Sequence, residues 1–271
     1  MTTHARAARG AVAPLHGGAD RTVGTWVVDL DGVIWLAGEP IRGGGEAVER
    51  LRAAGARVLF ASNNAAPTVG ELCERLARAG IAAGPDDVVT SAQAAASMIE
   101  PGSRAFVVGE AGVLEALGAR GVDVVDDAPA DVVVVGWTRR FDFDMLAGAQ
   151  RVVRAGARLI GTNEDPTHPT PDGLLPGAGS LLVAVATASG QKPEVAGKPH
   201  PPLARLIASR ATAVSMVVGD RPSTDGALAR HLRAPFALVL SGVTPRGADV
   251  GGPPPDVVAD DFLGVVAGAI G

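Results

Sequence analysis

The 271-residue sequence contains a single cysteine, Cys73, and only two lysines, Lys192 and Lys198, among its 24 basic residues. One cysteine cannot close an internal disulfide bond, so nothing demands an oxidising compartment, and we expect a cytoplasmic protein. No charge-free apolar run approaches the roughly 18 residues of a transmembrane helix, so no membrane partner is expected. The net charge of −5, without a basic stripe, argues against nucleic acid as a partner.

What the sequence does have is a repeated alternation of short apolar runs and helical segments. Strand-like runs occupy residues 23–28, 57–61, 105–108, 131–135, 158–160, 214–218 and 236–240. Helical segments follow them at residues 46–54, 68–80, 113–119, 143–154, 180–188, 202–209 and 225–233. This alternation predicts an α/β fold, with a parallel sheet covered by helices on both faces.

Three local signals predict where two of these helices begin and which face of one helix is buried. Thr68 and Glu71 have the spacing of a capping box, which predicts a helix start at Thr68. Cys73 falls on the apolar face of that helix, so we interpret it as a buried structural thiol. Ser180 is placed to cap the helix that ends near residue 188.

The sequence predicts three parts: an N-terminal tail, a core and an inserted cap. Residues 1–21 lack a continuous apolar segment, so we expect a disordered tail or an over-extended start and not a signal peptide, with an Arg/Ala-rich transit-like peptide as a weaker alternative. The turn-rich stretch 163–179 is too long for an ordinary connection, which indicates a functional loop or a link between domains. We therefore predict one α/β core, residues 22–100 and 187–271, interrupted by an inserted α/β cap at residues 101–186.

Polar residues gather where the predicted strands end. Asp29 and Asp31 follow the first strand and Ser62 follows the second, whereas Asp220 follows a late strand. Ligands of an open α/β sheet bind beyond these carboxyl ends. A dinucleotide site would need a glycine-rich turn after the first strand, and paired carboxylates would repel a pyrophosphate. Carboxylates can face a phosphate if a cation lies between them, and Mg²⁺ suits that position.

Four motifs occur in order: Asp-x-Asp-Gly-Val from Asp29, Ser-Asn-Asn from Ser62, Gly-Lys-Pro from Gly197, and Gly-Asp-Arg-x-x-Thr-Asp from Gly219. From about residue 24 onward, this succession resembles the haloacid dehalogenase superfamily, and within it the NagD-like phosphatases of subfamily IIA. The resemblance implies a Rossmann-like core with an inserted α/β cap of the C2 type. It also implies a Mg²⁺-dependent phosphatase that acts on a small phosphorylated metabolite, with a possible homodimer through the cap.

The resemblance assigns roles to individual residues. Asp29 would be the nucleophile that forms an aspartyl-phosphate, and Asp31 the general acid and base. Mg²⁺ would be held by Asp29, by the backbone carbonyl of Asp31 and by Asp220. Asp225 would hold metal-bound waters or orient Lys198.

The resemblance also names groups for the substrate. Ser62, Asn63, Asn64 and Lys198 would contact the phosphoryl oxygens, with Lys198 supplying positive charge. In a chain whose other basic residues are almost all arginine, the retention of this lysine agrees with a need for a compact ammonium. Four cap residues are further candidates for substrate contact: Trp137, Arg139, Asn163 and Asp165.

The substrate stays open between several phosphomonoesters. Residues 165–180 are most similar to actinobacterial glycerol 3-phosphate phosphatases, so glycerol 3-phosphate or 2-phosphoglycolate is favoured over pyridoxal phosphate, sugar phosphates and nucleoside monophosphates. Gly226 and Ala65 depart from the family pattern, which puts packing details in doubt. A phosphorylated signalling receiver is a weaker alternative, because its short single domain and mid-chain acceptor do not fit the insertion and the Asp-x-Asp of the first strand. An inactive binding protein is also weaker, since the acidic residues are all present.

Overall fold

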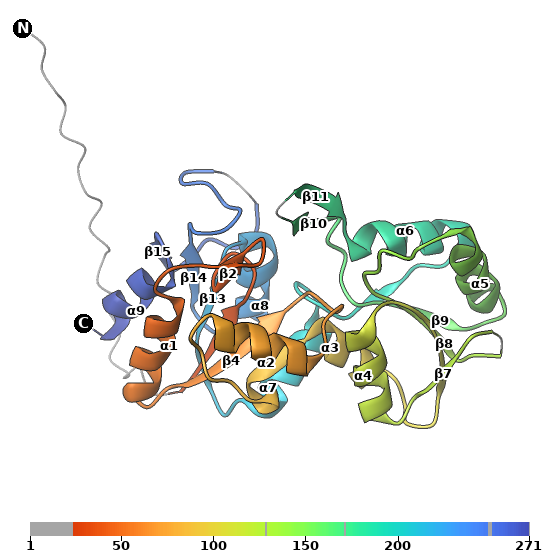
Figure 1. Ribbon diagram of the computed structural model, residues 1–271, viewed down its shortest axis with the longest axis horizontal. Helices are drawn as coiled ribbons and strands as arrows, with labels where there is room; N and C mark the ends of the chain where they lie inside the picture. Colours follow the sequence, from red (N-terminus) through yellow and green to blue (C-terminus); the bar gives the residue numbers. More distant parts are fainter. Residues whose placement is uncertain (1–23, 128, 171, 249–250, 271) are drawn as a thin grey trace, which may run out of the picture.

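The computed structural model describes residues 24–127, 129–170, 172–248 and 251–270, so the predicted N-terminal tail lies outside the described residues. A six-stranded, fully parallel sheet has the order β15-β14-β13-β1-β4-β5. Its strands are β1 (Thr25–Asp29), β4 (Arg57–Ser62), β5 (Val88–Thr90), β13 (Val214–Gly219), β14 (Phe236–Val239) and β15 (Val257–Ala259). The predicted α/β fold with a parallel sheet is confirmed, and Figure 1 shows that the first and last thirds of the chain build this sheet together.

Helices cover both faces of this sheet because successive strand residues point to opposite sides. On β1, Trp26 and Val28 face one apolar cluster and Val27 faces the other. The first cluster is completed by α1 (Gly44–Ala53), α2 (Val69–Arg78) and α9 (Phe262–Ile270). The second is completed by α3 (Ser91–Ser97), α7 (Pro201–Arg210) and α8 (Ala227–Leu232).

A second parallel sheet follows α3, with the order β12-β9-β8-β6-β7. Its strands are β6 (Arg104–Val108), β7 (Asp123–Val125), β8 (Val132–Val135), β9 (Arg158–Gly161) and β12 (Glu194–Val195). One face packs on α5 (Phe143–Arg154) and α6 (Ala178–Ser189), whereas the other packs on α4 (Ala111–Arg120) in a cluster shared with α3. The predicted boundary at residue 186 falls inside α6, and the second sheet continues to Val195.

Two hairpins lie outside these sheets. The first joins β2 (Trp35–Leu36) to β3 (Glu39–Pro40), directly after the turn that leaves β1. The second joins β10 (Thr167–Thr170) to β11 (Gly173–Pro176) within the turn-rich stretch, and Figure 1 shows it on the side that faces the six-stranded sheet. Two short helical turns, Pro85–Asp87 and Pro222–Gly226, precede β5 and α8.

Several local predictions can be compared with the structure. The Thr68 capping box is confirmed, with both of its hydrogen bonds to Glu71 present. The Ser180 cap is wrong, because α6 begins earlier with Gly177 as its N-cap, and the Ser180 hydroxyl donates to the Pro166 carbonyl. Cys73 packs against an apolar cluster, but it is only half-buried where a buried structural thiol was expected.

The two departures from the family pattern are accommodated by packing. A Cβ atom on Gly226 would lie 3.2 Å from the Phe236 ring, so the bare glycine lets this aromatic residue approach the start of α8. Ala65 is buried with 1% exposure. Its methyl group therefore sits in the core, where a hydroxyl would need a partner.

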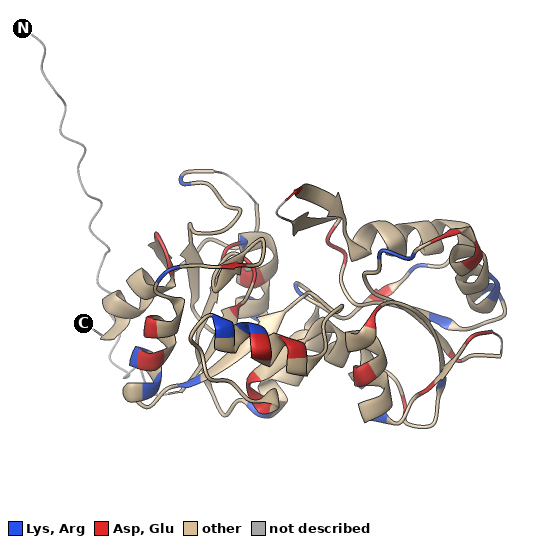
Figure 2. Cartoon of the chain, in the orientation of Figure 1, with Lys and Arg blue, Asp and Glu red and all other residues tan. Residues whose placement is uncertain are grey.

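The surface carries mixed charges. Figure 2 shows basic and acidic segments interspersed over the helices around both sheets, which agrees with the absence of a basic stripe in the sequence. Among the described residues, no helix combines the length and apolar character required to cross a membrane.

Candidate active site

The candidate site lies at the carboxyl edge of the six-stranded sheet. Asp29 is the last residue of β1, Ser62 is the last of β4, and Asp220 directly follows β13. Lys198 reaches the same edge from the loop between β12 and α7. All four are buried although each is polar, which is costly unless they are paired with one another or with a ligand.

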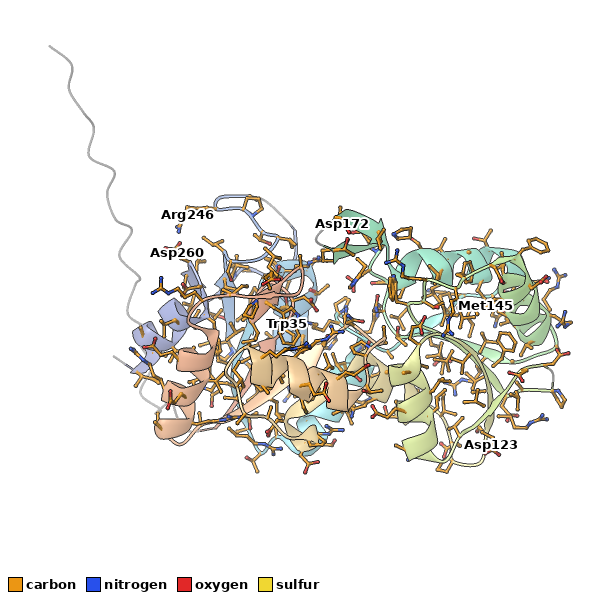
Figure 3. All side chains as sticks on the ribbon, in the orientation of Figure 1. Trp35, Asp123, Met145, Asp172, Arg246 and Asp260 are labelled. Carbon is orange, nitrogen blue, oxygen red and sulfur yellow. The ribbon has the colours of Figure 1, made fainter. Side chains whose placement is uncertain are left out.

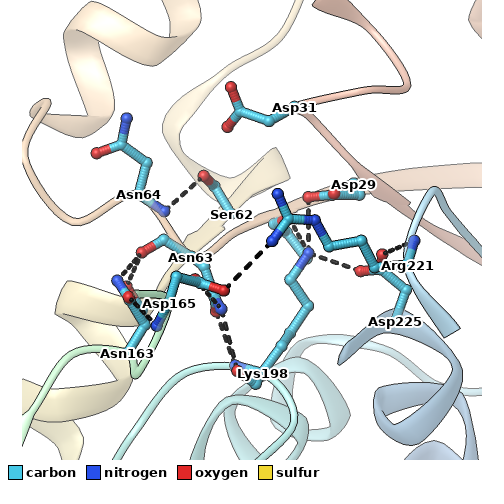
Figure 4. A network of polar contacts seen from close by, with 12 residues as sticks. Asp29, Asp31, Ser62, Asn63, Asn64, Asn163, Asp165, Lys198, Arg221 and Asp225 are labelled. Carbon is cyan, nitrogen blue, oxygen red and sulfur yellow. Dashed lines mark hydrogen bonds and ion pairs between the residues drawn. The ribbon is translucent and has the colours of Figure 1, made fainter. Parts of the chain in front are cut away.

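Lys198 is the centre of this arrangement, as Figure 4 shows. Its Nζ donates to Asp29 Oδ1 at 2.6 Å and to Asp225 Oδ1 at 2.7 Å. The Ala61 carbonyl lies 3.4 Å from the same nitrogen. The ammonium is 3% exposed, so it acts as a buried counter-charge held between two carboxylates.

Three carboxylates form the acidic part of the site. Oxygen atoms of Asp29, Asp220 and Asp225 all lie within 4.8 Å of one another. With Lys198 as the buried cation among them, the negative charges are not balanced. A small divalent cation with a preference for carboxylate oxygen fits this donor set, so the residues present suit Mg²⁺.

The backbone around Asp220 is shaped to hold its carboxylate. The Val243 N–H donates to Asp220 Oδ2 at 2.7 Å. A Cβ atom on either Gly32 or Gly242 would overlap that carboxylate, so both glycines allow the chain to approach it closely. Gly32 also has a φ of 88°, which an L side chain rarely adopts.

Burial sets the protonation behaviour of these groups. It raises the pKa of Asp29 well above 3.8, although the Lys198 charge opposes the shift. Burial and the neighbouring Asp225 charge raise the pKa of Asp220 to about 6. Burial alone would lower the pKa of Lys198, but Asp225 and Asp29 more than offset it, so the net pKa of Lys198 is raised. The ammonium is therefore charged at neutral pH.

Asp31 lies apart from the three clustered carboxylates. Figure 4 shows its side chain directed away from Asp29. Its Oδ1 accepts a hydrogen bond of 3.0 Å from the Trp35 indole N–H, and burial raises its pKa. This placement agrees with the predicted acid–base role, which needs a carboxyl group that is not a metal ligand.

The Ser-Asn-Asn turn after β4 organises the edge of the site. Ser62 Oγ accepts from the Asn64 N–H at 3.0 Å, and Asn64 Oδ1 accepts from the Ala66 N–H at 3.1 Å. Asn63 binds the backbone of Lys198 on both sides: its Oδ1 accepts from the N–H at 2.7 Å, and its Nδ2 donates to the carbonyl at 3.0 Å. Asn63 thus fixes the loop that carries the ammonium.

Residues of the second α/β unit close over this turn. Asn163 Nδ2 donates to the Asn63 carbonyl at 2.8 Å, and Asp165 Oδ2 accepts from Asn63 Nδ2 at 3.0 Å. The Arg221 guanidinium approaches Asp165 at 3.6 Å from the opposite side (Figure 4). These contacts join the loop after β9 to the loops after β4 and β13.

One cavity of about 80 Å³ opens between the two units. It is lined by the predicted residues Asp29, Asp31, Asn63, Asn64, Trp137, Asn163, Asp165, Lys198 and Asp220. The predicted substrate contact Arg139 does not line it, because it belongs to a separate cavity with Phe141 and Leu181. Ser62 and Asp225 are not lining residues either; they lie buried behind the lining.

Seven lining residues were not assigned a site role from sequence, and two of them, Arg221 and His168, carry a basic side chain. Arg221 belongs to the Gly-Asp-Arg motif, so its position next to Asp220 was the available signal. His168 reaches the cavity from the β10–β11 hairpin and contacts the Trp137 ring, with centroids 5.1 Å apart. The strand pairing that brings it there could not be derived from a turn-rich stretch.

The sequence matches two models of known protein families. A model described as haloacid dehalogenase-like hydrolase matches residues 26–123, and one described as HAD-hydrolase-like matches residues 195–265. The chain is similar to a D-glycerol 3-phosphate phosphatase of Mycobacterium tuberculosis, 40% identical over 80% of this chain and 63% of that protein. It thus spans less than two thirds of that relative. A dihydroxyacetone phosphatase of Corynebacterium glutamicum is 34% identical over 81% of this chain and 82% of its own length.

Solved structures show the same similarity. The glycerol phosphate phosphatase of M. tuberculosis in complex with magnesium aligns with a TM-score of 0.81 and 34% identity, covering 90% of this chain and 77% of that one. A p-nitrophenyl phosphatase from Archaeoglobus fulgidus aligns with a TM-score of 0.84 and 32% identity, covering 90% of this chain and 98% of that one.

Proposed function

This chain belongs to the haloacid dehalogenase-like hydrolases, and we propose that it hydrolyses a small phosphomonoester through an aspartyl-phosphate, an acyl phosphate formed on Asp29. One observation carries the proposal: a buried carboxylate at the end of β1 lies 2.6 Å from a buried ammonium and beside two further carboxylates. A receiver domain is not supported, because the matching family models are those of hydrolases.

In the first step, an Asp29 carboxylate oxygen attacks phosphorus in line, and the bond from phosphorus to the ester oxygen breaks. Lys198 holds Asp29 Oδ1 and brings positive charge to the edge where the phosphoryl oxygens gather. Ser62 and the Ser-Asn-Asn turn would contact the other phosphoryl oxygens. Asp31 gives its proton to the departing alkoxide.

In the second step, water attacks the phosphorus of the aspartyl-phosphate, and Asp31 takes the proton of that water. The bond from phosphorus to Asp29 breaks, which releases phosphate and restores both carboxyl groups. Asp29, Asp220 and the Asp31 backbone carbonyl would hold Mg²⁺, with Asp225 behind them. When bound, Mg²⁺ supplies positive charge that lets a phosphate dianion approach a group of carboxylates.

The size of the cavity supports a short substrate. Its volume of about 80 Å³ is far below the roughly 300–1,000 Å³ typical of sites for drug-sized ligands. Glycerol 3-phosphate or 2-phosphoglycolate therefore fits this proposal better than pyridoxal phosphate or a nucleoside monophosphate. Two similar proteins are named for glycerol 3-phosphate and dihydroxyacetone, both three-carbon compounds, so glycerol 3-phosphate is favoured over the two-carbon 2-phosphoglycolate.

A panel of small phosphates tests the function. We expect Mg²⁺-dependent phosphate release, abolished by EDTA, with the highest kcat/KM for a three-carbon phosphate. A preference for nucleoside monophosphates would contradict the substrate proposal. Phosphate release that is unaffected by EDTA would contradict the metal proposal.

Asp31→Asn tests the separation of acid–base chemistry from metal binding. We expect kcat to fall by about 10²- to 10⁴-fold, because the amide neither gives nor takes the required proton. Stabilisation by Mg²⁺ should persist, since the Asp31 side chain lies outside the carboxylate cluster. The measurements are kcat and the Mg²⁺-induced change in Tm. Loss of that Tm change would instead assign the Asp31 carboxylate to the metal.

The pKa of Asp220 predicts how Mg²⁺ and protons compete. Because this pKa is raised from 3.8 to about 6, its contribution to stability is full below about pH 4 and is lost as pH rises through 6. Mg²⁺ binds the ionised carboxylate, so its stabilising effect should be small near pH 5 and should grow as pH passes 6. Thermal unfolding with Mg²⁺ or EDTA between about pH 5 and pH 8 measures this. A Tm difference independent of pH would contradict the prediction, and Asp220→Asn should flatten the profile.

The domain roles, oligomeric state and location remain part of the proposal. The inserted unit with the five-stranded sheet would act as a cap that excludes water. Phe143 on α5 and Val183 on α6, two helices that pack together, are exposed apolar side chains and would form the contact of a homodimer through the cap. Sedimentation of wild type and Phe143→Asp would test this pairing. We also propose a cytoplasmic location, since a single cysteine requires no oxidising compartment.

A further inference from the structure

Trp35 contacts the Asp31 side chain of the site, and the sequence motifs do not predict this contact. It starts β2, after the turn that leaves β1, and its indole N–H donates to Asp31 Oδ1 at 3.0 Å. Among the described residues, this indole is the hydrogen-bond donor that holds the Asp31 carboxyl group. Figure 3 shows Trp35 within the half of the molecule that contains the six-stranded sheet.

The indole is held firmly. Trp35 is 5% exposed and packs in the apolar cluster with α1 and α9. Its backbone carbonyl accepts from the Gly32 N–H at 2.6 Å, and its own N–H donates to the Leu30 carbonyl at 3.2 Å. Asp31 lies between those two partners in the chain. The ring and the carboxyl group are thus fixed relative to each other by the same turn.

The hydrogen bond from the indole to Oδ1 favours the position of the proton on Oδ2. An indole N–H can donate but cannot accept, so the oxygen bonded to it cannot use the same lone pair for a proton. Asp31 lines the cavity that holds Asp29. With Oδ1 engaged by Trp35, the proton given to the leaving group is directed to Oδ2.

We propose that Trp35 is a positioning residue for proton transfer: its indole keeps the Asp31 side chain away from the metal carboxylates and directs Oδ2 toward the leaving-group oxygen. This inference rests on the acid–base role proposed for Asp31. It adds a residue that acts through Asp31 and is not itself among the residues that line the cavity.

Trp26 provides a matched control for the packing of the indole. It lies in the same apolar cluster, is fully buried, and its indole N–H meets no hydrogen-bond partner in the part of the chain that the structure describes. Trp26→Phe and Trp35→Phe therefore remove the same atoms from one core. Only Trp35→Phe removes a hydrogen bond to Asp31.

The test compares leaving groups. An alkyl phosphate such as glycerol 3-phosphate needs a proton on its departing alkoxide, whereas p-nitrophenolate leaves as a stable anion. For Trp35→Phe we expect kcat/KM to fall about 10- to 100-fold with the alkyl ester and less than about 3-fold with the aryl ester. Trp26→Phe should lower both equally, if at all, and Asp31→Asn should show a larger selective loss than Trp35→Phe.

The possible outcomes distinguish a failure of the Trp35 proposal from a failure of the acid–base role proposed for Asp31. Equal losses with both esters in Trp35→Phe, or the same selective loss in Trp26→Phe, overturn the positioning role while wild-type activity stands. Wild-type alkyl turnover by Asp31→Asn overturns the acid–base proposal itself. If Trp35→Phe does not fold, benzothienylalanine at position 35 keeps the ring volume and replaces the N–H with sulfur. The same selective loss is expected there, and wild-type behaviour would refute the inference.

Discussion

Asp29→Asn is expected to lower kcat by about 10⁴-fold or more, because the amide cannot attack phosphorus and no second nucleophile occupies its place. The protein should still fold. Burial raises the pKa of Asp29 well above its ordinary value, so the neutral amide suits the site without metal at least as well as the carboxylate does. Initial rates of phosphate release with saturating Mg²⁺ measure the effect.

Asp123→Asn is the control for this substitution. Asp123 is exposed on β7 of the five-stranded sheet, far from Asp29 in sequence, and Figure 3 labels it. The Asp123→Asn variant should therefore keep the wild-type kcat. Release by Asp29→Asn above about one hundredth of the wild-type rate would contradict the nucleophile assignment, since loss of a nucleophile costs far more.

Lys198→Met is expected to damage both stability and catalysis. Removal of the ammonium leaves Asp29 and Asp225 buried without their shared partner. Breaking a buried ion pair from one side costs about 3–5 kcal/mol. We expect a loss of this size in EDTA, smaller when Mg²⁺ supplies the missing charge, together with a fall in kcat of about 10²-fold or more.

The second lysine of the chain is the matched control. Lys192 is exposed near β12, so Lys192→Met should change neither Tm nor kcat. Lys198→Arg is also expected to lose activity, because a planar guanidinium cannot take the place of a compact ammonium between two carboxylates. Undiminished kcat in Lys198→Arg would refute the argument made from lysine usage. Unchanged stability in Lys198→Met would refute the buried counter-charge.

The position of the site could be predicted from sequence because it follows from the fold. Asp29, Ser62 and Asp220 each come directly at the end of an apolar run, and parallel strands bring such ends to one edge. Lys198 could be assigned to the same site because it belongs to the Gly-Lys-Pro motif and because lysine is rare in this chain. The structure places its ammonium between two carboxylates, which the sequence could not show.

Other parts could not be derived from a single sequence. The two-residue strands β2 and β12 are too short to give a periodic signal, and α3 (SAQAAAS) is too uniformly small to show an apolar stripe. The ion pair of Arg221 with Asp165 and the hydrogen bond of Trp35 to Asp31 depend on side-chain direction. Arg139 shows the converse: Trp137, two positions before it, lines both cavities, whereas Arg139 lines only the second.

The stereochemistry at phosphorus tests the central claim most directly. A substrate made chiral at phosphorus with sulfur and oxygen isotopes reports each in-line displacement as one inversion. Transfer first to Asp29 and then to water involves two inversions, so the account predicts that the released thiophosphate retains the configuration of the substrate. Net inversion would mean that water attacks the ester directly, and it would contradict the intermediate on Asp29.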